Sequence, residues 1–179
     1  VPRTTDGAEF ALRAVLGQQV STAAARTQTA RLVQRFGDPM PDPGGGLTHL
    51  FPTPATIAAL QPEDVPGPRR RAETLIGLAR ALADGDLDLG PGADRAEARV
   101  TLGSLSGIGP WTVELVAMRS LGDPDALPAA DLGVARAVEH LGIGDPNAAA
   151  QRWRPWRSYA TQYLWATLPH PINQLPEAT

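Results

Sequence analysis

The sequence predicts an all-α fold, a compact bundle of short helices that forms a single domain over residues 1–179. Three observations support this class. Apolar residues recur at helical spacing along most of the chain, capping residues and Pro or Gly stops bracket the helical segments, and no segment has the alternation of a strand. A length of 179 residues with 42% hydrophobic content is enough for a substantial core.

The predicted helices of the first half are set by their caps and stops. After a first helix, Ser21 is a suitable N-cap for a helix that Gly37 ends. A loop rich in Pro and Gly follows, and Thr53 with Pro54 then starts a short helix to Leu60. Longer helices are expected over 68–84, on one apolar stripe of Ala72, Leu75, Ala79 and Leu82, and over 94–104.

The second half continues in the same manner. Pro110 begins a helix that Gly122 closes, and Asp131 stands at the cap position of a helix over 132–141. Further helices are expected to start at Asp145-Pro146 and at Pro155. In the last helix Trp165 is predicted on the polar face, opposite an apolar stripe of Trp156, Tyr159, Ala160, Tyr163, Leu164 and Leu168.

Composition excludes several kinds of site. The chain has no cysteine, which excludes disulfides and thiolate metal sites, and His49, His140 and His170 lack the spacing of metal ligands. No run of about 18 apolar residues is present, so we expect no membrane contact. The chain begins without Met or a signal-peptide pattern, and we expect a domain of a longer, cytoplasmic, nucleoid-associated bacterial protein.

Charge is unevenly distributed along the chain. The net charge of −3 disfavours nucleic acid, yet residues 1–37 contain five Arg against two acids, whereas 83–97 contain five acids and one Arg. Opposite charges are therefore expected on different faces, although a mixed solvated surface is the alternative. All 16 cationic side chains are Arg, so the chain has no lysine amine.

The stretch LSGIGPWT, residues 105–112, combines two glycines with a helix start at Pro110. Glycines let backbone N–H groups approach a ligand closely, and a helix N-terminus favours negative charge. Together they form an anion-binding turn that needs no cationic side chain, and a DNA phosphodiester suits it. The alternative is a plain corner between two helices, in which glycine only permits close packing.

Four ordered segments, RAVLGQQVS (13–21), GIGPWT (107–112), LPAADLG (127–133) and RWRPWRSYA (152–160), resemble AlkA-type 3-methyladenine DNA glycosylases of the helix–hairpin–helix superfamily. The resemblance covers almost the whole chain. It implies an enzyme of base excision repair that extrudes an alkylated purine from double-stranded DNA and hydrolyses its N-glycosidic bond. It further implies a monomer, no required cofactor, and a preceding domain or a fused regulator outside this chain.

The resemblance assigns roles to individual residues. Asp131 matches the catalytic carboxylate that stabilises an oxocarbenium-like sugar, and an N-cap role is compatible with this. Trp111 and Trp165 match aromatic residues of the base pocket, where an indole attracts a cationic base. The alternatives are a core position for Trp111 and contact with a further domain or partner for Trp165. Leu115 and Leu132 stand where the AlkA type has pocket aromatics, which bears on substrate range.

The hairpin and the loop before it also receive expected roles. Gln19 matches the wedge residue, which fills the gap left by the extruded nucleotide; the AlkA type has a leucine there, and Gln18-Gln19 as ordinary polar residues at a helix end is the alternative. The expected DNA contacts are Gly107, Ile108, Gly109 and Thr112. The expected ligands of a monovalent cation are the backbone carbonyls of Gly103, Leu105 and Ile108.

The absence of lysine predicts a glycosylase without lyase activity. Bifunctional members of the superfamily use a Lys amine, two residues after the second hairpin glycine, where this chain has Trp111. A guanidinium stays protonated and cannot replace the amine. The rival hypothesis is a non-catalytic helix–hairpin–helix module that only grips DNA, and a purely structural interaction domain is a third. Neither of these needs Asp131 with two tryptophans.

Overall fold

The computed structural model describes residues 1–41 and 47–169, and over these residues every regular element is a helix. Pro39 and His49 form one isolated antiparallel bridge. The elements are α1 (Gly7–Leu16), α2 (Thr22–Phe36), α3 (Pro54–Ala58), the 3-10 helix η1 (Pro62–Asp64), α4 (Arg69–Ala83), α5 (Arg95–Ser104), α6 (Pro110–Arg119), α7 (Leu132–His140), α8 (Pro146–Arg152) and α9 (Arg157–Ala166). The predicted all-α class is confirmed. No helix in these ranges is long and apolar enough to cross a membrane.

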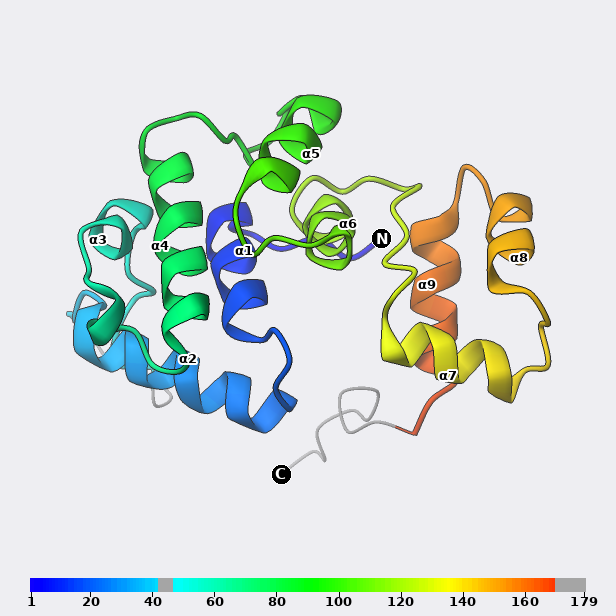
Figure 1. Cartoon of the computed structure of the whole chain (residues 1–179), viewed down its shortest axis with the longest axis horizontal. Helices are drawn as coiled ribbons and strands as arrows, with labels where there is room; N and C mark the ends of the chain where they lie inside the picture. The colour runs from blue at the N-terminus through cyan, green and yellow to red at the C-terminus, as the bar shows by residue number, and fades with distance from the viewer. Residues whose placement is uncertain (42–46, 170–179) are drawn as a thin grey trace.

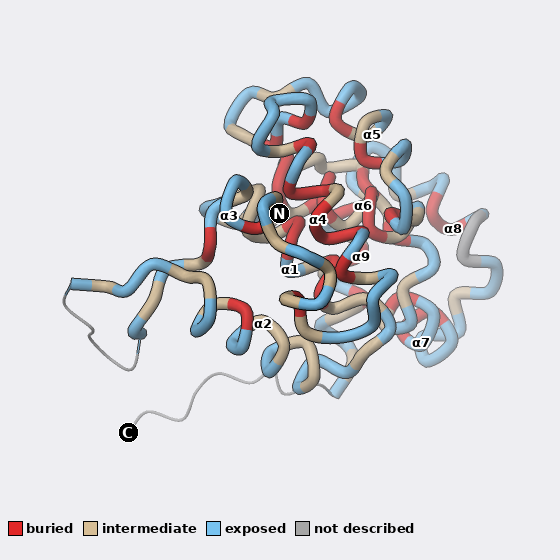
Figure 2. The backbone as a smooth tube through the Cα atoms, turned by 60° about the vertical axis from the view of Figure 1, so that its left-hand side comes forward, coloured by how far each residue is buried: buried red, intermediate tan, exposed pale blue. Residues whose placement is uncertain are grey.

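The helices form two lobes, α1–α6 in one and α7–α9 in the other (Figure 1). The larger lobe is built around α1, α4 and α6, whose inner faces are buried (Figure 2). A separate small cluster forms the core of the second lobe, with Leu164 of α9 packed on Val134, Ala137 and Val138 of α7. Trp165 packs against both clusters, so it lies where the two lobes meet.

Side-chain caps begin several helices where the sequence predicts them. Ser21 Oγ accepts the N–H of Ala24, over 3.2 Å, at the start of α2. Asp94 caps α5 by accepting two backbone N–H groups, and these bonds hold the pKa of its carboxyl below its ordinary value. A capped end is a local property of the chain, which is why the sequence locates it.

The last helix differs from its prediction. It begins at Arg157 rather than Pro155, and the predicted apolar stripe is wrong, because Trp156, Tyr159 and Tyr163 are 57%, 42% and 76% exposed. The buried face instead contains Ser158, Thr161 and Leu164. Hydrogen bonds explain this choice. Ser158 Oγ donates to the carbonyl of Asp123 (2.7 Å), with that of Ala126 at 2.9 Å, so a small hydroxyl is buried at little cost.

Candidate active site and DNA interface

The two glycines of the turn between α5 and α6 differ in how strictly the fold requires them. Gly107 has φ +83°, and a Cβ there would lie 2.0 Å from Oγ1 of Thr74 on α4. Ile108, 7% exposed, anchors the turn in the core. Gly109 has φ −91°, and beyond its chain neighbours a Cβ would meet no atom of the described residues within 4 Å. The fold therefore requires glycine at 107 but not at 109, where the backbone is open to a ligand.

The N-terminus of α6 offers unpaired backbone donors at this turn. Pro110 occupies the first helical position, and within the described chain no side chain caps the helix start. The N–H groups of Trp111 and Thr112 are therefore without intrahelical acceptors. Together with the helix dipole, they make a site that can hold a phosphate without a cationic side chain.

Thr112 contacts the cleft but is almost wholly buried. The residue is 2% exposed, and its Oγ1 accepts the Nε2 N–H of Gln18 over 3.0 Å. The same Nε2 lies 3.2 Å from the carbonyl of Gly107. The hydroxyl of Thr112 is therefore engaged by Gln18 rather than free for a ligand. Sequence reasoning missed the role of Gln18, because two adjacent glutamines after a helix carry no signal that distinguishes them.

Gln19, the expected wedge, is exposed in the loop between α1 and α2. Its φ of +56° is the one positive φ of a non-glycine residue among the residues that the structure describes. A left-handed non-glycine residue costs about 1 kcal/mol and persists only where its surroundings fix it. This loop is therefore held in an unusual conformation beside the hairpin.

Asp131 is the N-cap of α7, and its carboxylate also accepts hydrogen bonds from side chains of α6 and α9. Its Oδ1 accepts the N–H of Val134 (3.0 Å) and the indole N–H of Trp165 (2.8 Å). Its Oδ2 accepts the indole N–H of Trp111 (3.0 Å). A carboxylate oxygen accepts about two hydrogen bonds. Among the described residues this leaves one acceptor position on Oδ2, so that oxygen is available to a substrate or a water molecule.

Trp165 is half-buried and packs on both cores. It lies on the polar side of α9 near Ser158, as predicted, but this side carries the buried hydroxyls and faces the protein interior rather than the solvent. Arg119 lies over its ring, with the guanidinium carbon 5.6 Å from the centroid. One indole face is therefore occupied, and the N–H edge is committed to Asp131.

Gly133 makes room for this arrangement, and sequence reasoning missed it too. A Cβ at Gly133 would lie 2.9 Å from Oδ1 of Asp131 and 3.0 Å from Cδ1 of Trp165. Its position two residues after the carboxylate is the only sequence signal. A side chain there would push apart the two groups whose hydrogen bond organises the site.

The loop that leads to Asp131 is held on one side by α5 and α6. Glu114 accepts the backbone N–H of Leu127 over 2.8 Å and pairs with Arg99 over 3.0 Å. Arg99 also pairs with Asp123 over 2.8 Å. Burial lowers the pKa of Arg99, but its bonds to Glu114 and Asp123 outweigh burial and raise it above its ordinary value. These groups fix the loop to the larger lobe.

On the other side, α9 holds the same loop through Asp125. Arg157 donates to both carboxylate oxygens of Asp125, over 2.7 and 3.0 Å, and Arg154 adds a bond of 2.6 Å. Burial raises the pKa of Asp125, but the bonds and charges of Arg157 and Arg154 hold it below its ordinary value. The position of Asp131 therefore depends on both lobes.

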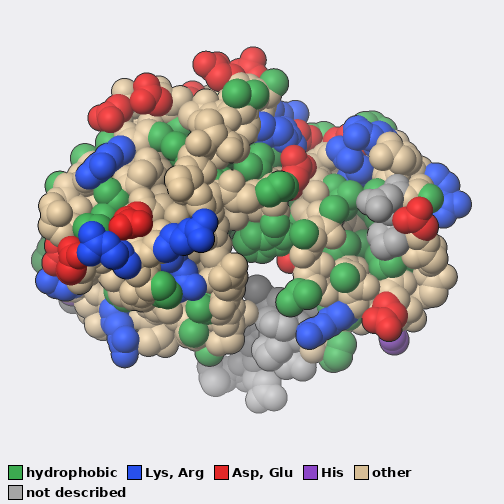
Figure 3. Space-filling view, viewed as in Figure 1, with side chains coloured by type: hydrophobic (Ala, Val, Ile, Leu, Met, Phe, Trp, Pro, Cys, Tyr) green, Lys and Arg blue, Asp and Glu red, His purple; other side chains and the backbone are tan. Residues whose placement is uncertain are grey.

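A cleft of about 760 Å³ brings several of the expected residues together, but Trp165 is not among those that line it. Figure 3 shows the molecule hollowed between its lobes, with hydrophobic side chains around the opening. The cleft contacts the α1–α2 loop, the hairpin and the start of α7; its lining residues include Gln19, Gly107, Gly109, Trp111, Asp131 and Leu132. Leu132 is 72% exposed at the rim, whereas Leu115 is half-buried and outside the lining.

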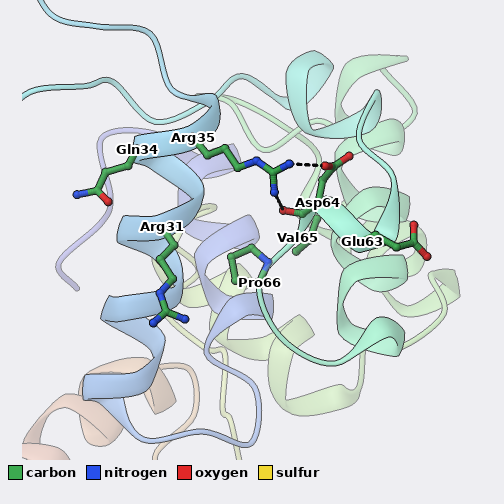
Figure 4. Close-up of a pocket in the computed structure, with 7 residues that line it drawn as sticks. All are labelled: Arg31, Gln34, Arg35, Glu63, Asp64, Val65 and Pro66. Atoms are coloured by element: carbon green, nitrogen blue, oxygen red, sulfur yellow. Dashed lines mark hydrogen bonds and ion pairs between the residues drawn. The ribbon is translucent and has the colours of Figure 1, made fainter.

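A second hollow, of about 430 Å³, lies between α2 and η1. Figure 4 shows Arg35 turned to Asp64, with which it forms an ion pair of 2.8 Å, while Arg31 points along α2. None of the residues that line this hollow was expected in the site, and two of its charged residues, Arg35 and Asp64, are paired with each other. The cleft at Asp131 is therefore the candidate site.

Two further expectations concern metal ions. Of the three expected carbonyl ligands, that of Leu105 accepts the N–H of Ile108 over 3.1 Å, which leaves its second lone pair for a cation. Gly103 is exposed at the end of α5, whereas Ile108 is buried. Over the described ranges, no group of three His, Asp or Glu could hold a metal ion; His170 lies outside the described residues.

A helix–hairpin–helix with an open helix N-terminus, beside a cleft lined by one indole and by a carboxylate that a second indole holds, defines a protein of the base excision repair class. The family model described as HhH-GPD superfamily base excision DNA repair protein matches residues 12–157. The chain belongs to this superfamily.

Similar proteins agree with this membership. The chain is 52% identical, over 98% of its length, to the probable bifunctional transcriptional activator/DNA repair enzyme AlkA of Mycobacterium tuberculosis (strain ATCC 25618 / H37Rv), and spans 36% of that protein. It is 35% identical, over 93% of its length, to DNA-3-methyladenine glycosylase 2 of Escherichia coli (strain K12), spanning 60% of it. The solved 3-methyladenine DNA-glycosylase of Archaeoglobus fulgidus superposes with a TM-score of 0.72 at 30% identity, covering 92% of this chain and 59% of the other.

Proposed function

We propose that this domain is a DNA glycosylase that hydrolyses the N-glycosidic bond of alkylated purines in double-stranded DNA. The observation that carries the proposal is the carboxylate of Asp131, held by Trp111 and Trp165 at a cleft beside the hairpin. The proteins similar to this chain include 3-methyladenine glycosylases, which supports the substrate class. The chain covers only part of these relatives, so its activity as an isolated domain belongs to the proposal.

The geometry suggests how the chemistry proceeds. A purine alkylated on its ring is cationic and leaves readily, so the enzyme mainly has to stabilise the positive charge that develops on the sugar. Asp131 supplies a fixed negative charge for this, and the remaining acceptor position of Oδ2 can orient the attacking water. Three N–H donors hold the carboxylate in place, so little reorganisation is needed during the reaction.

Binding to DNA follows from the two loops at the cleft. The N-terminus of α6, where beyond the chain neighbours no described atom would lie within 4 Å of a Cβ on Gly109, holds a phosphate, and Gln19 fills the gap left by the extruded nucleotide. The carbonyls of Gly103, Leu105 and Ile108 would hold a monovalent cation, which would add positive charge near the phosphate. We further propose that the domain acts as a monomer, and that a preceding domain or a fused regulator belongs to the whole protein.

The proposed reaction ends with an abasic site and an intact strand. The chain contains no lysine, so no side chain can form the imine that a lyase step requires. The alternative function, a module that only grips DNA, shares the hairpin. It leaves the two indole bonds to Asp131 without a purpose.

The experiment that tests the proposal is release of free base from methylated duplex DNA. Asp131→Asn should reduce the rate by about 10³-fold or more, as expected when a group that stabilises a developing charge is removed. The Asn amide also meets an indole N–H, so the thermal midpoint and the DNA affinity are measured in parallel. Asp84→Asn, at the exposed end of α4, is the control for charge. Binding without base release by the parent domain would instead support the gripping module.

A further inference from the structure

Arg71 connects α4 to the loop that carries Gln19. It is half-buried, and its Nη2 donates to the backbone carbonyl of Gln18 over 2.6 Å. Its Nη1 donates to Oε1 of Gln28 on α2 over 3.0 Å. The bond to Gln18 fixes the peptide that immediately precedes the left-handed Gln19. A single guanidinium of α4 therefore joins this loop to α2.

Gln18 extends the connection to the hairpin. While its carbonyl accepts from Arg71, its side-chain amide donates to Thr112 Oγ1 (3.0 Å) and lies 3.2 Å from the carbonyl of Gly107. Loop and hairpin are 89 residues apart in the chain, so this residue is a direct bridge between them.

The same face of α4 supports both loops. Arg71 and Thr74 are three residues apart and so lie one above the other on the helix. Arg71 contacts the loop, and Thr74 contacts Gly107 so closely that a Cβ there would lie 2.0 Å from its hydroxyl. The separation between Gln19 and the hairpin is therefore set by one rigid helix turn.

We propose that Gln18 and Arg71 are positioning residues for nucleotide extrusion. They keep Gln19 at a fixed distance from the phosphate-binding hairpin. The hairpin can therefore bind the DNA backbone while Gln19 fills the gap left by the extruded nucleotide. This inference rests on the proposed function and extends it to the step before chemistry. Because Gln19 is in a conformation that isolated chains disfavour, loss of either bond releases it toward ordinary φ values.

The test is a double-mutant cycle between Arg71→Gln and Gln19→Ala. Single-turnover base release measures the chemistry, and the fluorescence of 2-aminopurine in duplex DNA measures extrusion. Gln18→Met removes the hydrogen bonds of the side-chain amide at nearly constant side-chain volume. It provides a second variant if Arg71→Gln does not fold. Arg70→Gln is the matched control. Arg70 directly precedes Arg71 on α4 and is exposed, and its substitution removes the same charge.

We expect Arg71→Gln and Gln18→Met each to reduce extrusion and base release by about tenfold, with affinity for undamaged duplex within about twofold. In the Gln19→Ala background, Arg71→Gln should change either rate by less than about twofold, because Arg71 acts through Gln19. An equal loss in both backgrounds, or the same loss in Arg70→Gln, overturns the inference. So does a fully active Gln19→Ala protein. If the parent extrudes 2-aminopurine but releases no base, the glycosylase proposal fails. The double-mutant cycle measured by 2-aminopurine fluorescence then still tests the positioning role of Gln18 and Arg71.

Discussion

The indole N–H of Trp165 on α9 donates to Oδ1 of Asp131 at the start of α7, over 2.8 Å. Trp111 of the larger lobe donates to the other oxygen, so the carboxylate joins the two lobes at its own position. The role of the two tryptophans is therefore not limited to lining the cleft, to which only Trp111 of the two contributes. They orient the one acidic group on which the proposed chemistry depends.

Trp165→Phe tests this orienting role, because it keeps an aromatic ring and removes only the N–H edge. We expect base release to slow by about tenfold or more, with a small change in thermal midpoint. Trp165→Ala should also lower the thermal midpoint, because the ring packs on both cores. Single-turnover rates and thermal denaturation measure both effects.

Trp111→Phe is the matched variant on the other oxygen. A similar loss in both Phe variants is expected if the two bonds share the orientation of Asp131. Full activity of both Phe variants would mean that only the aromatic faces matter.

Gly133→Ala separates helix stability from site geometry. Alanine favours a helix over glycine by up to about 1 kcal/mol, but the new methyl would stand 2.9 Å from Oδ1 of Asp131. We expect base release to fall by about tenfold while the thermal midpoint changes little. Gly77→Ala on α4 is the control, since its Cβ meets no described atom within 4 Å and should leave activity intact. An unchanged rate in Gly133→Ala would show that the site tolerates this crowding.

Local signals in the sequence were sufficient for the fold and for part of the site. Caps such as Ser21 and Asp131 predict helix starts because the residue bonds to its own helix. The inward face of α9 was not predictable in this way, because Ser158 is buried by bonds to a distant loop. The bridge made by Gln18 likewise depends on a contact 89 residues away. Hydrogen bonds between residues far apart in the chain leave no periodic pattern in the sequence.

Gly107→Ala should mainly lower stability, whereas Gly109→Ala should mainly weaken DNA binding. At 107 a side chain meets Thr74 and an unfavourable φ, so we expect unfolding to become easier by about 2 kcal/mol or more. At 109 we expect a stability change within about 0.5 kcal/mol but a DNA affinity several-fold weaker, because the methyl covers the helix N-terminus. Denaturant titration and duplex binding measure the pair. Tighter binding by Gly109→Arg, with the fold intact, would show that the backbone site does not hold the phosphate.

Acid should weaken the loop that supports Asp131. The pKa of Asp125 lies below its ordinary 3.8 in the folded protein, because the bonds and charges of Arg157 and Arg154 outweigh burial. Its stabilising effect is therefore complete above pH 3.8 and is lost as the pH falls toward the lower folded value. Urea denaturation at falling pH should show a shallower acid limb in Asp125→Asn than in the parent. Identical acid limbs would mean that this carboxylate does not contribute to acid unfolding.

The absence of lysine leads to a prediction about the end of the reaction. A lyase step needs a neutral amine that attacks the sugar, forms an imine and then allows strand cleavage. All 16 cationic side chains here are Arg, and position 111, where bifunctional relatives are expected to have the lysine, is Trp. Water must then attack in its place, and the strand should remain intact until alkali is added.

Borohydride reduction during turnover measures this directly, since it converts an imine into a stable covalent adduct between protein and DNA. We expect no adduct on a denaturing gel, and strand breaks only after alkali. The same experiment is run with the N-terminal α-amino group of the protein used in the assay blocked by acetylation. An adduct that persists after acetylation would contradict the hydrolytic mechanism, because no guanidinium can form the imine.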